Sequence, residues 1–458
     1  MISKPRATAS RMLLAVIMIG GVLSGAGAPV NASAGWRAPV RTVDRAYGDG
    51  PVRTRSAGES VNIRFRAQRG DLVRLRIPGW LPDCVRTSLW RHDRRLDPQA
   101  SGYWRAKEPG FHEFRFRSCD RLRAGRELQL VKLVVRTARP DGAEVNFPRR
   151  RGYEYAADVT VPAEGVLLQP RVRQFYRAFR SIAPRNGPPR TLWFGRFVVL
   201  LPGSQVFAGG AELPRPDLAV RTGSRFRVFV KDAVALRVGR PSVTEAVVDG
   251  DPIQLAEGAE PGFREIRFTG TAGQWVYPAY TPLQSRLTHL LVGPDHHLVP
   301  LTAIGQTSGG LYHLSGSGAH RLLVIGPPAA ASVRLRTALE LPAMPLDGTK
   351  TVFAPSTPGQ VVVAPFVMPE QVSYRFAASD STLTGSWLAS AHTLDYPHCP
   401  PRGPQGCGEW AGAIVTPSNP EAGPISRSGG AGERWVTVLW PPPDSTGQLQ
   451  LSITPGFW

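Results

Sequence analysis

The chain of 458 residues is poor in cysteine, methionine and acidic side chains. It has 4 cysteines and 5 methionines, and its 35 acidic residues stand against 55 basic ones. Apolar residues at a helical period of 3.6 occur best around 172–181 and hardly elsewhere. The main apolar run, 12–23, is shorter than the roughly 20 residues that a membrane-spanning helix needs. We therefore expect neither a helical protein nor a membrane span.

The sequence patterns of common enzymes are absent as well. The chain contains no GxSxG, no HExxH and no Walker-type phosphate loop. Ser317 lies near His320, but the surrounding SGSGAH is a glycine-led strand entry of a kind that recurs in the chain. A carboxylate pair for glycoside hydrolysis is recognised by its spatial separation, so the sequence leaves that chemistry open. We expect a protein that is not an enzyme and that binds no cofactor and no metal.

Glycine and proline are abundant. The 48 glycines and 44 prolines fall between short apolar runs, which is typical of many strands joined by turns. A composition of 42% apolar and 20% charged residues is that of a folded chain. An all-β fold is the prediction.

Residues 1–34 have the features of a cleaved signal peptide. These features are a basic start, an apolar run and a small-residue cleavage site: Lys4, Arg6 and Arg11, then 12–23, then Ala32, Ser33 and Ala34. Cleavage after Ala28 is the alternative. We expect the protein to be secreted and either released or held at the cell wall by non-covalent contacts.

Four cysteines in an exported protein predict two disulfides. Three pairings are possible, and position along the chain favours Cys84–Cys119 and Cys399–Cys407. A zinc site is the alternative, but no CxxC or HxxxH spacing accompanies the cysteines.

Two landmarks recur four times along the chain. Asp-Gly pairs begin at Asp49, Asp141, Asp249 and Asp347. Late in each interval a glycine leads into an alternating strand, at Gly110, Gly223, Gly318 and Gly432. We predict four tandem antiparallel β-sandwich units of jelly-roll or immunoglobulin type, with one strand face toward a core and the other toward water. The expected units are 35–140, 141–248, 249–346 and 347–458, the second and fourth being divergent and the fourth carrying a long loop.

The third unit resembles a known family. Its FTGTAGQWV, GPDHHL and SGAHRLLVIGPPAAASVRLRT segments look like the pre-peptidase C-terminal-type β-sandwich modules of secreted bacterial proteins. In that pattern a Gly-Gln pair opens a strand, here Gly273-Gln274, and a Pro-Asp-Gly turn follows, here Pro294-Asp295-His296 without the glycine. The resemblance covers 249–341 best. It implies a non-catalytic accessory role.

Two acidic turns invite a metal interpretation. Asp295, His296 and His297 could ligate a metal, but the matching hairpin of the first unit has Asp93 followed by two arginines, which cannot ligate. The segment Asp249-Gly250-Asp251 with Glu257 lacks the order of a calcium-binding loop. Turn chemistry explains both segments better.

The positive charge is concentrated in the first half of the chain. There are 24 basic against 11 acidic residues in 35–140, and 17 against 9 in 141–248. The counts are 6 against 7 in 249–346 and 5 against 8 in 347–458. Because similar units can be neutral, the unit itself does not demand this charge.

Arginines occupy the water-facing strand positions of the first unit. The expected polyanion-binding residues are Arg64, Arg66, Arg74, Arg76, Arg86, Trp90, Arg115 and Arg117. Arginine forks suit phosphate and carboxylate groups, so we predict attachment to an anionic cell-wall polymer or acidic glycan. Units three and four would be spacers or would hold a protein partner. No motif for sequence-specific nucleic-acid binding occurs.

The alternative function is a secreted glycan- or peptide-directed hydrolase. Its site would lie in the irregular loops of 181–210 or 396–430. Aromatic side chains that could stack on sugars are Trp80, Trp90, Tyr103 and Trp104, although strand aromatics are more often core residues.

Overall fold

A computed structural model of the chain describes most of residues 40–456. The described ranges are 40–79, 81–119, 122–172, 178–185, 187–192, 197–208, 211–213, 218–231, 233–255, 262–282, 287–305, 309–326, 331–368, 373–382, 384, 387–394, 411–415, 432–442 and 444–456. They contain 37 strands and no α-helix, which confirms the all-β prediction. In these ranges no helix has the length and apolarity to cross a membrane. The expected signal peptide, 1–34, lies outside them.

The strands form seven sheets, which we number in chain order. Sheet 1 has the order β1 (Val40–Asp44), β3 (Ser60–Ala67), β8 (Gly110–Arg117), β5 (Arg86–Arg91) and β6 (Arg94–Leu96). Sheet 2 has eight strands: β14 (Arg190–Thr191), β13 (Phe179–Pro184), β18 (Arg225–Val230), β11 (Tyr153–Thr160), β9 (Glu127–Ala138), β4 (Leu72–Arg76) and β7 (Trp104–Arg105), with β2 (Val52–Arg53) also on β9. Sheet 3 has the order β10 (Val145–Asn146), β19 (Ala233–Gly239), β12 (Val166–Val172), β15 (Val198–Leu200), β16 (Val206–Ala208) and β17 (Ala211–Leu213).

The remaining four sheets come from the second half of the chain. Sheet 4 has the order β20 (Ser242–Glu245), β22 (Phe263–Gly270), β28 (Gly318–Ile325), β24 (Thr288–Val292) and β25 (Leu298–Val299). Sheet 5 has the order β21 (Ile253–Leu255), β29 (Ala331–Thr337), β23 (Trp275–Thr281), β27 (Gly309–His313) and β26 (Leu301–Gly305). Sheet 6 has the order β30 (Leu339–Glu340), β32 (Val362–Val367), β36 (Arg434–Trp440), β34 (Trp387–Thr393) and β35 (Ala411–Val415). Sheet 7 has the order β31 (Thr351–Phe353), β37 (Leu449–Gly456) and β33 (Ser373–Ser379).

One pairing order recurs along the chain. A strand lies parallel to a later strand of the chain in the pairs β1–β3, β9–β11, β20–β22 and β30–β32. The later strand of each pair also pairs antiparallel with a glycine-led strand, which is β8, β18, β28 or β36. Gly110 and Gly318, which begin β8 and β28, have φ of 123° and 131°, a region that favours glycine. The recurring landmarks in the sequence therefore mark equivalent strands.

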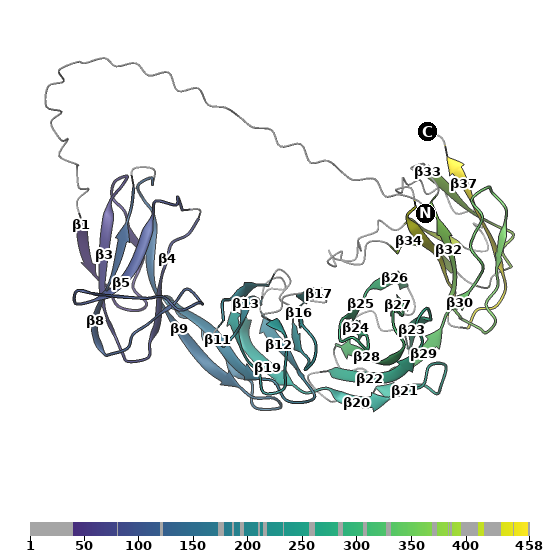
Figure 1. Cartoon of the computed structure of the whole chain (residues 1–458), viewed down its shortest axis with the longest axis horizontal. Coiled ribbons are helices and arrows are strands. Elements are labelled where there is room, and N and C mark those ends of the chain that lie inside the picture. The colour runs from purple at the N-terminus through teal and green to yellow at the C-terminus, as the bar shows by residue number, and fades with distance from the viewer. Residues whose placement is uncertain are drawn as a thin grey trace, which may run out of the picture. The chain divides into compact units, whose positions relative to one another are not determined.

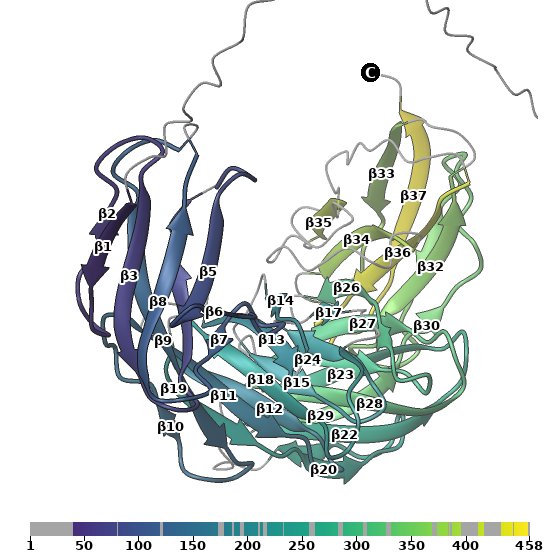
Figure 2. The same cartoon turned by 60° about the vertical axis from the view of Figure 1, so that its left-hand side comes forward.

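Four separate sandwich units, however, are not what the sheets form. The 12-residue strand β9 pairs with β4 through its first part and with β11 through Lys132–Ala138, so sheet 2 joins strands from 35–140 and 141–248. Figure 1 shows β9 leading from the first strands of the chain to β11, and the two strands lie side by side in Figure 2.

Apolar clusters link each sheet to the next. Sheets 1 and 2 share one cluster and sheets 2 and 3 another, and the same holds for sheets 4 and 5 and for sheets 6 and 7. Two further clusters join what were expected to be separate units. One packs Phe207 of sheet 3 with Leu323 of sheet 4, and the other packs Tyr277 of sheet 5 with Trp440 of sheet 6.

The expectation that each strand has one water-facing side is therefore wrong for sheets 3 and 4. Val198–Leu200 of β15 are buried at every position, as are Leu322–Ile325 of β28. Such continuous apolar runs are typical of strands covered on both faces. The sheets form one succession of packed layers instead of four independent cores.

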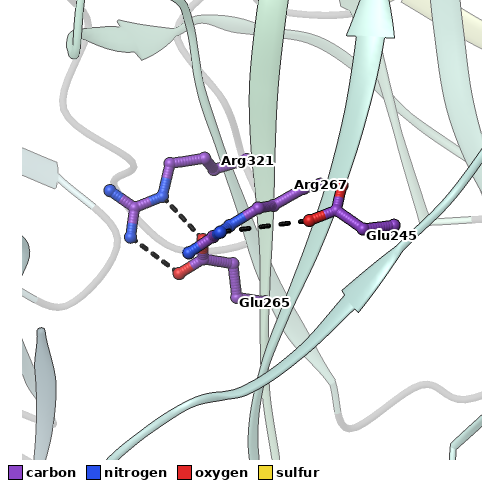
Figure 3. Close-up of polar contacts among 4 residues, drawn as sticks. All are labelled: Glu245, Glu265, Arg267 and Arg321. Carbon is purple, nitrogen blue, oxygen red and sulfur yellow. Dashed lines mark hydrogen bonds and ion pairs between the residues drawn. The ribbon is translucent and has the colours of Figure 1, made fainter. Parts of the chain in front are cut away.

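An ion-pair network crosses the buried part of sheet 4. Glu265 on β22 is fully buried, and its carboxylate accepts hydrogen bonds from Arg321 at 2.9 and 2.7 Å and from Arg267 at 2.6 Å (Figure 3). Arg267 also lies 3.9 Å from Glu245 of β20. The network ties three strands of sheet 4 together.

The disulfide Cys84–Cys119 is present, as predicted. Cys399 and Cys407 lie outside the described residues.

The described parts of the two acidic segments considered as metal sites form turns, and Glu257 lies outside the described residues. Asp295 accepts a hydrogen bond from the His297 backbone N–H at 3.1 Å, and Asp249 accepts one from Thr337 N–H at 3.0 Å. The hairpin that contains Asp93 is shorter than the hairpin that contains Asp295. Arg91 pairs with Arg94 in the first, whereas Val292 pairs with Leu298 in the second. The turn carboxylates thus bind backbone.

Candidate anion-binding site

The eight residues expected to bind a polyanion fall on two sheets. Arg64 and Arg66 of β3, Arg115 and Arg117 of β8, and Arg86 and Trp90 of β5 share the side of sheet 1 that faces away from the core. Arg74 and Arg76 belong to β4 of sheet 2. The arginines of β4 thus belong to a different sheet from those of β3, β5 and β8.

Much of the charge on sheet 1 is already paired. Arg64 binds Asp44 at 2.7 Å, and Arg115 binds Glu113 at 2.7 Å. Arg117 donates to the Asn62 side chain at 2.8 Å. The hydrogen bond from Arg64 lowers the pKa of Asp44.

Aromatic rings on sheet 1 are covered by arginines. The Arg115 guanidinium lies 4.1 Å from the centre of the Trp90 ring, and Arg66 lies 4.9 Å from the centre of the Phe111 ring. Tyr103 and Trp104 are 2% and 8% exposed, so they are core residues, and Trp80 lies outside the described residues. Sugar stacking on Trp90 would first require Arg115 to move.

A groove of about 1460 Å³ lies beside sheet 2 and is the stronger candidate. Strands β4, β9, β11 and β18 contribute to its wall. Its described lining includes nine basic residues: Arg74, Arg76, Arg136, Arg149, Arg150, Arg151, Arg171, Arg180 and Lys231. Glu154 is the single carboxylate among the lining residues that the structure describes. The groove therefore carries a strongly positive potential.

Local backbone geometry places the run Arg149–Arg151 in the wall. The N–H of Tyr153 bonds to the Arg150 carbonyl at 3.2 Å, which closes a turn just before β11. Gly152 has φ of 76°, and a Cβ there would lie 2.4 Å from the Gly48 nitrogen. Glycine is needed at 152 for both reasons. The three arginines are consequently held at the start of β11.

Glu154 is the centre of a hydrogen-bonded cluster, which we call the Glu154 cluster. The Glu154 carboxylate accepts from the Arg74 guanidinium and from the Tyr103 hydroxyl, and it lies 3.7 Å from Arg180. The Arg74 guanidinium also lies 5.0 Å from the Tyr103 ring centre. Burial, followed by the Glu154 charge, raises the pKa of Tyr103, so its hydroxyl stays a donor.

The basic residues outside this cluster are mostly unpaired. Arg136, Arg149, Arg150, Arg151 and Lys231 form no ion pair with any residue that the structure describes, and all five are exposed. Arg171 lies 3.4 Å from Glu144, and Arg76 donates to Gln129 at 2.6 Å. Five cations thus remain for an external anion.

Of the expected site residues, only Arg74 and Arg76 line the groove. The other lining arginines were missed, although the run Arg149–Arg151 is visible in the sequence. Its relation to Arg74 depends on the parallel pairing of β9 with β11, which has no local signal in the sequence.

The described part of the chain contains no group of three or more His, Cys, Asp or Glu side chains that could hold a metal ion. The loops 181–210 and 396–430, considered for a hydrolase site, are described only in part.

Comparisons with known proteins add no identity. No family model matches the chain, and no curated protein matches it. A solved structure of a multicopper oxidase from Campylobacter jejuni is 8% identical to this chain, with a TM-score of 0.12. The match covers 71% of this chain and 81% of the oxidase chain. A likeness that weak carries no argument about fold or function.

Proposed function

We propose that this protein is a secreted, non-enzymatic binding protein whose groove beside sheet 2 holds an anionic cell-wall polymer or acidic glycan. The observation that carries the proposal is the lining: nine basic residues and one described carboxylate around a single groove.

The size and charge of the groove suit a polymer segment better than a small molecule. Clefts for drug-sized ligands are roughly 300–1,000 Å³, and this groove is about 1460 Å³. Guanidinium forks bind phosphate, sulfate and carboxylate oxygens in pairs. Several exposed arginines side by side raise the local concentration of a polyanion and speed its association.

Residues 249–458 would serve as a spacer or would hold a protein partner. They contain 11 basic and 15 acidic residues, so they add no positive charge to the attachment. The resemblance of 249–341 to pre-peptidase C-terminal-type modules stays a prediction and agrees with an accessory role.

The first prediction tests the groove in the whole secreted chain. Replacing the three exposed arginines (R149A/R150A/R151A) should weaken binding of a glycerol phosphate oligomer roughly ten-fold or more at about 0.1 M salt, since each surface cation contributes on the order of 1 kcal/mol near an anionic surface. The affinity should also depend less steeply on salt. Titration calorimetry at several salt concentrations measures both quantities.

The matched control removes three other exposed arginines of the same interval, R185A/R221A/R225A, none of which lines the groove. It should keep most of the affinity. Equal losses in the two variants, or no binding by the native protein, would refute the proposal. Fragments are unsuitable for this test, because a cut after residue 248 would expose the cluster shared by sheets 3 and 4.

A further inference from the structure

We infer that the groove selects polyanions that carry free hydroxyl groups, such as polyol phosphates or acidic glycans, and that Glu154 is the residue that recognises the hydroxyls. This inference rests on the proposed function and names the class of ligand.

The position of Glu154 works against the binding of a purely anionic ligand. Its carboxylate lies among the basic residues that line the groove, and its negative charge repels phosphate and sulfate groups. A groove built only to hold anions gains nothing from a carboxylate at this place. A ligand that donates hydrogen bonds as well would benefit from it.

The Glu154 carboxylate has acceptor capacity to spare. A carboxylate has about four lone-pair sites. One oxygen accepts from Arg74 and the other from Tyr103, whereas Arg180 at 3.7 Å is beyond hydrogen-bond distance. The side chain is 17% exposed, so a ligand hydroxyl can reach it.

The partners of Glu154 fix its orientation before any ligand arrives. Arg74 is 15% exposed, and the buried Tyr103 ring packs 6.0 Å from Phe229. An acceptor that is already positioned loses little entropy on binding. The exposed arginines would then hold the anionic groups while Glu154 accepts from the hydroxyls between them.

The test compares two oligomers of equal charge and nearly equal length. A 1,3-linked glycerol phosphate oligomer has one free hydroxyl per repeat, and a 1,3-propanediol phosphate oligomer has none. The native chain should bind the glycerol oligomer roughly ten-fold more tightly, as expected for a hydrogen bond to a charged acceptor. In E154A the ratio of the two affinities should fall to about one. E154A should also bind the propanediol oligomer more tightly than the native chain does.

E154Q is a second variant in case E154A misfolds, because glutamine keeps the shape of the side chain and removes its charge. It should also bind the propanediol oligomer more tightly than the native chain does, and thermal unfolding of both variants reports their folded state. If Glu154 only neutralises Arg74, replacing it would change stability but would leave the preference for the glycerol oligomer unchanged. That result would overturn the inference. Equal binding of both oligomers by the native chain would overturn it too. If neither oligomer binds, the proposed function itself fails.

Discussion

Replacing Trp440 by alanine should lower the free energy of unfolding by about 3–5 kcal/mol, the usual cost of emptying a large aromatic site in a packed core. Trp440 on β36 is 2% exposed and lies in the cluster between sheets 5 and 6. Its ring centre lies 6.2 Å from that of Tyr277 on β23, in an edge-to-face arrangement. The Tyr277 hydroxyl accepts a hydrogen bond from Val361 N–H at 3.2 Å, so the two sheets are also joined by polar contacts.

A matched control for W440A lies in the same sheet. Val367 at the end of β32 is 54% exposed, and V367A should change stability by less than about 0.5 kcal/mol. Urea denaturation followed by far-UV circular dichroism measures both. A W440A variant as stable as V367A would mean that sheets 5 and 6 do not share a core.

Replacing Arg321 by methionine should be equally damaging. The change leaves the fully buried Glu265 without its two-pronged partner, and breaking a buried ion pair by removing one partner costs about 3–5 kcal/mol. R267M should cost less, because Arg267 is 42% exposed and its removal leaves the Arg321 bonds intact. Adding E265Q to R321M should recover part of the loss, since it removes a buried charge that Arg267 alone would then compensate. Denaturant unfolding of the native chain, R321M, E265Q and R321M/E265Q measures the coupling between Arg321 and Glu265. An R321M variant as stable as R267M would contradict the prediction that Arg321 is the more important partner of Glu265.

The same carboxylate makes stability depend on pH. Burial alone would raise the pKa of Glu265, but the hydrogen bonds from Arg321 and Arg267 outweigh burial and hold it below the ordinary value of 4.5. The stabilisation is therefore fully present above pH 4.5 and declines as the pH falls through the lower pKa of the folded state. In E265Q this component should be missing, so its unfolding free energy should change less below pH 4.5. If the unfolding free energies of the native protein and E265Q fell in parallel below pH 4.5, Glu265 would not contribute to the pH dependence.

The sequence predicts strands better than it predicts which surfaces they share. Alternation in NIRFRA and EFRF correctly places Ile63, Phe65 and Phe114 in a core, and chain position correctly pairs Cys84 with Cys119. The middle sheets were misjudged because Val198–Leu200 and Leu322–Ile325 do not alternate, and this absence of alternation was itself the signal of burial on both faces.

The candidate site was harder to predict for a topological reason. β3 and β4 follow one another closely in sequence, yet they belong to different sheets, so the arginines of β3 and those of β4 lie on separate surfaces. Arg74 instead meets Glu154, 80 residues further along the chain. Only the order of strands in sheet 2 brings these two side chains together.

Sheet 1 is the first of the packed layers, and this position explains the arginines on its outer face without any ligand. Each of sheets 3 to 6 shares apolar clusters with two neighbouring sheets, but among the described residues sheet 1 shares a cluster only with sheet 2. A layered β protein must end in a polar surface, or the exposed end would attract further copies of itself. The arginines of β3 and β8, paired with Asp44 and Glu113, provide such a terminal cap. The paired arginines of sheet 1 thus give the first layer a polar end, whereas Arg136, Arg149, Arg150 and Arg151 beside sheet 2 have no ion-pair partner among the described residues.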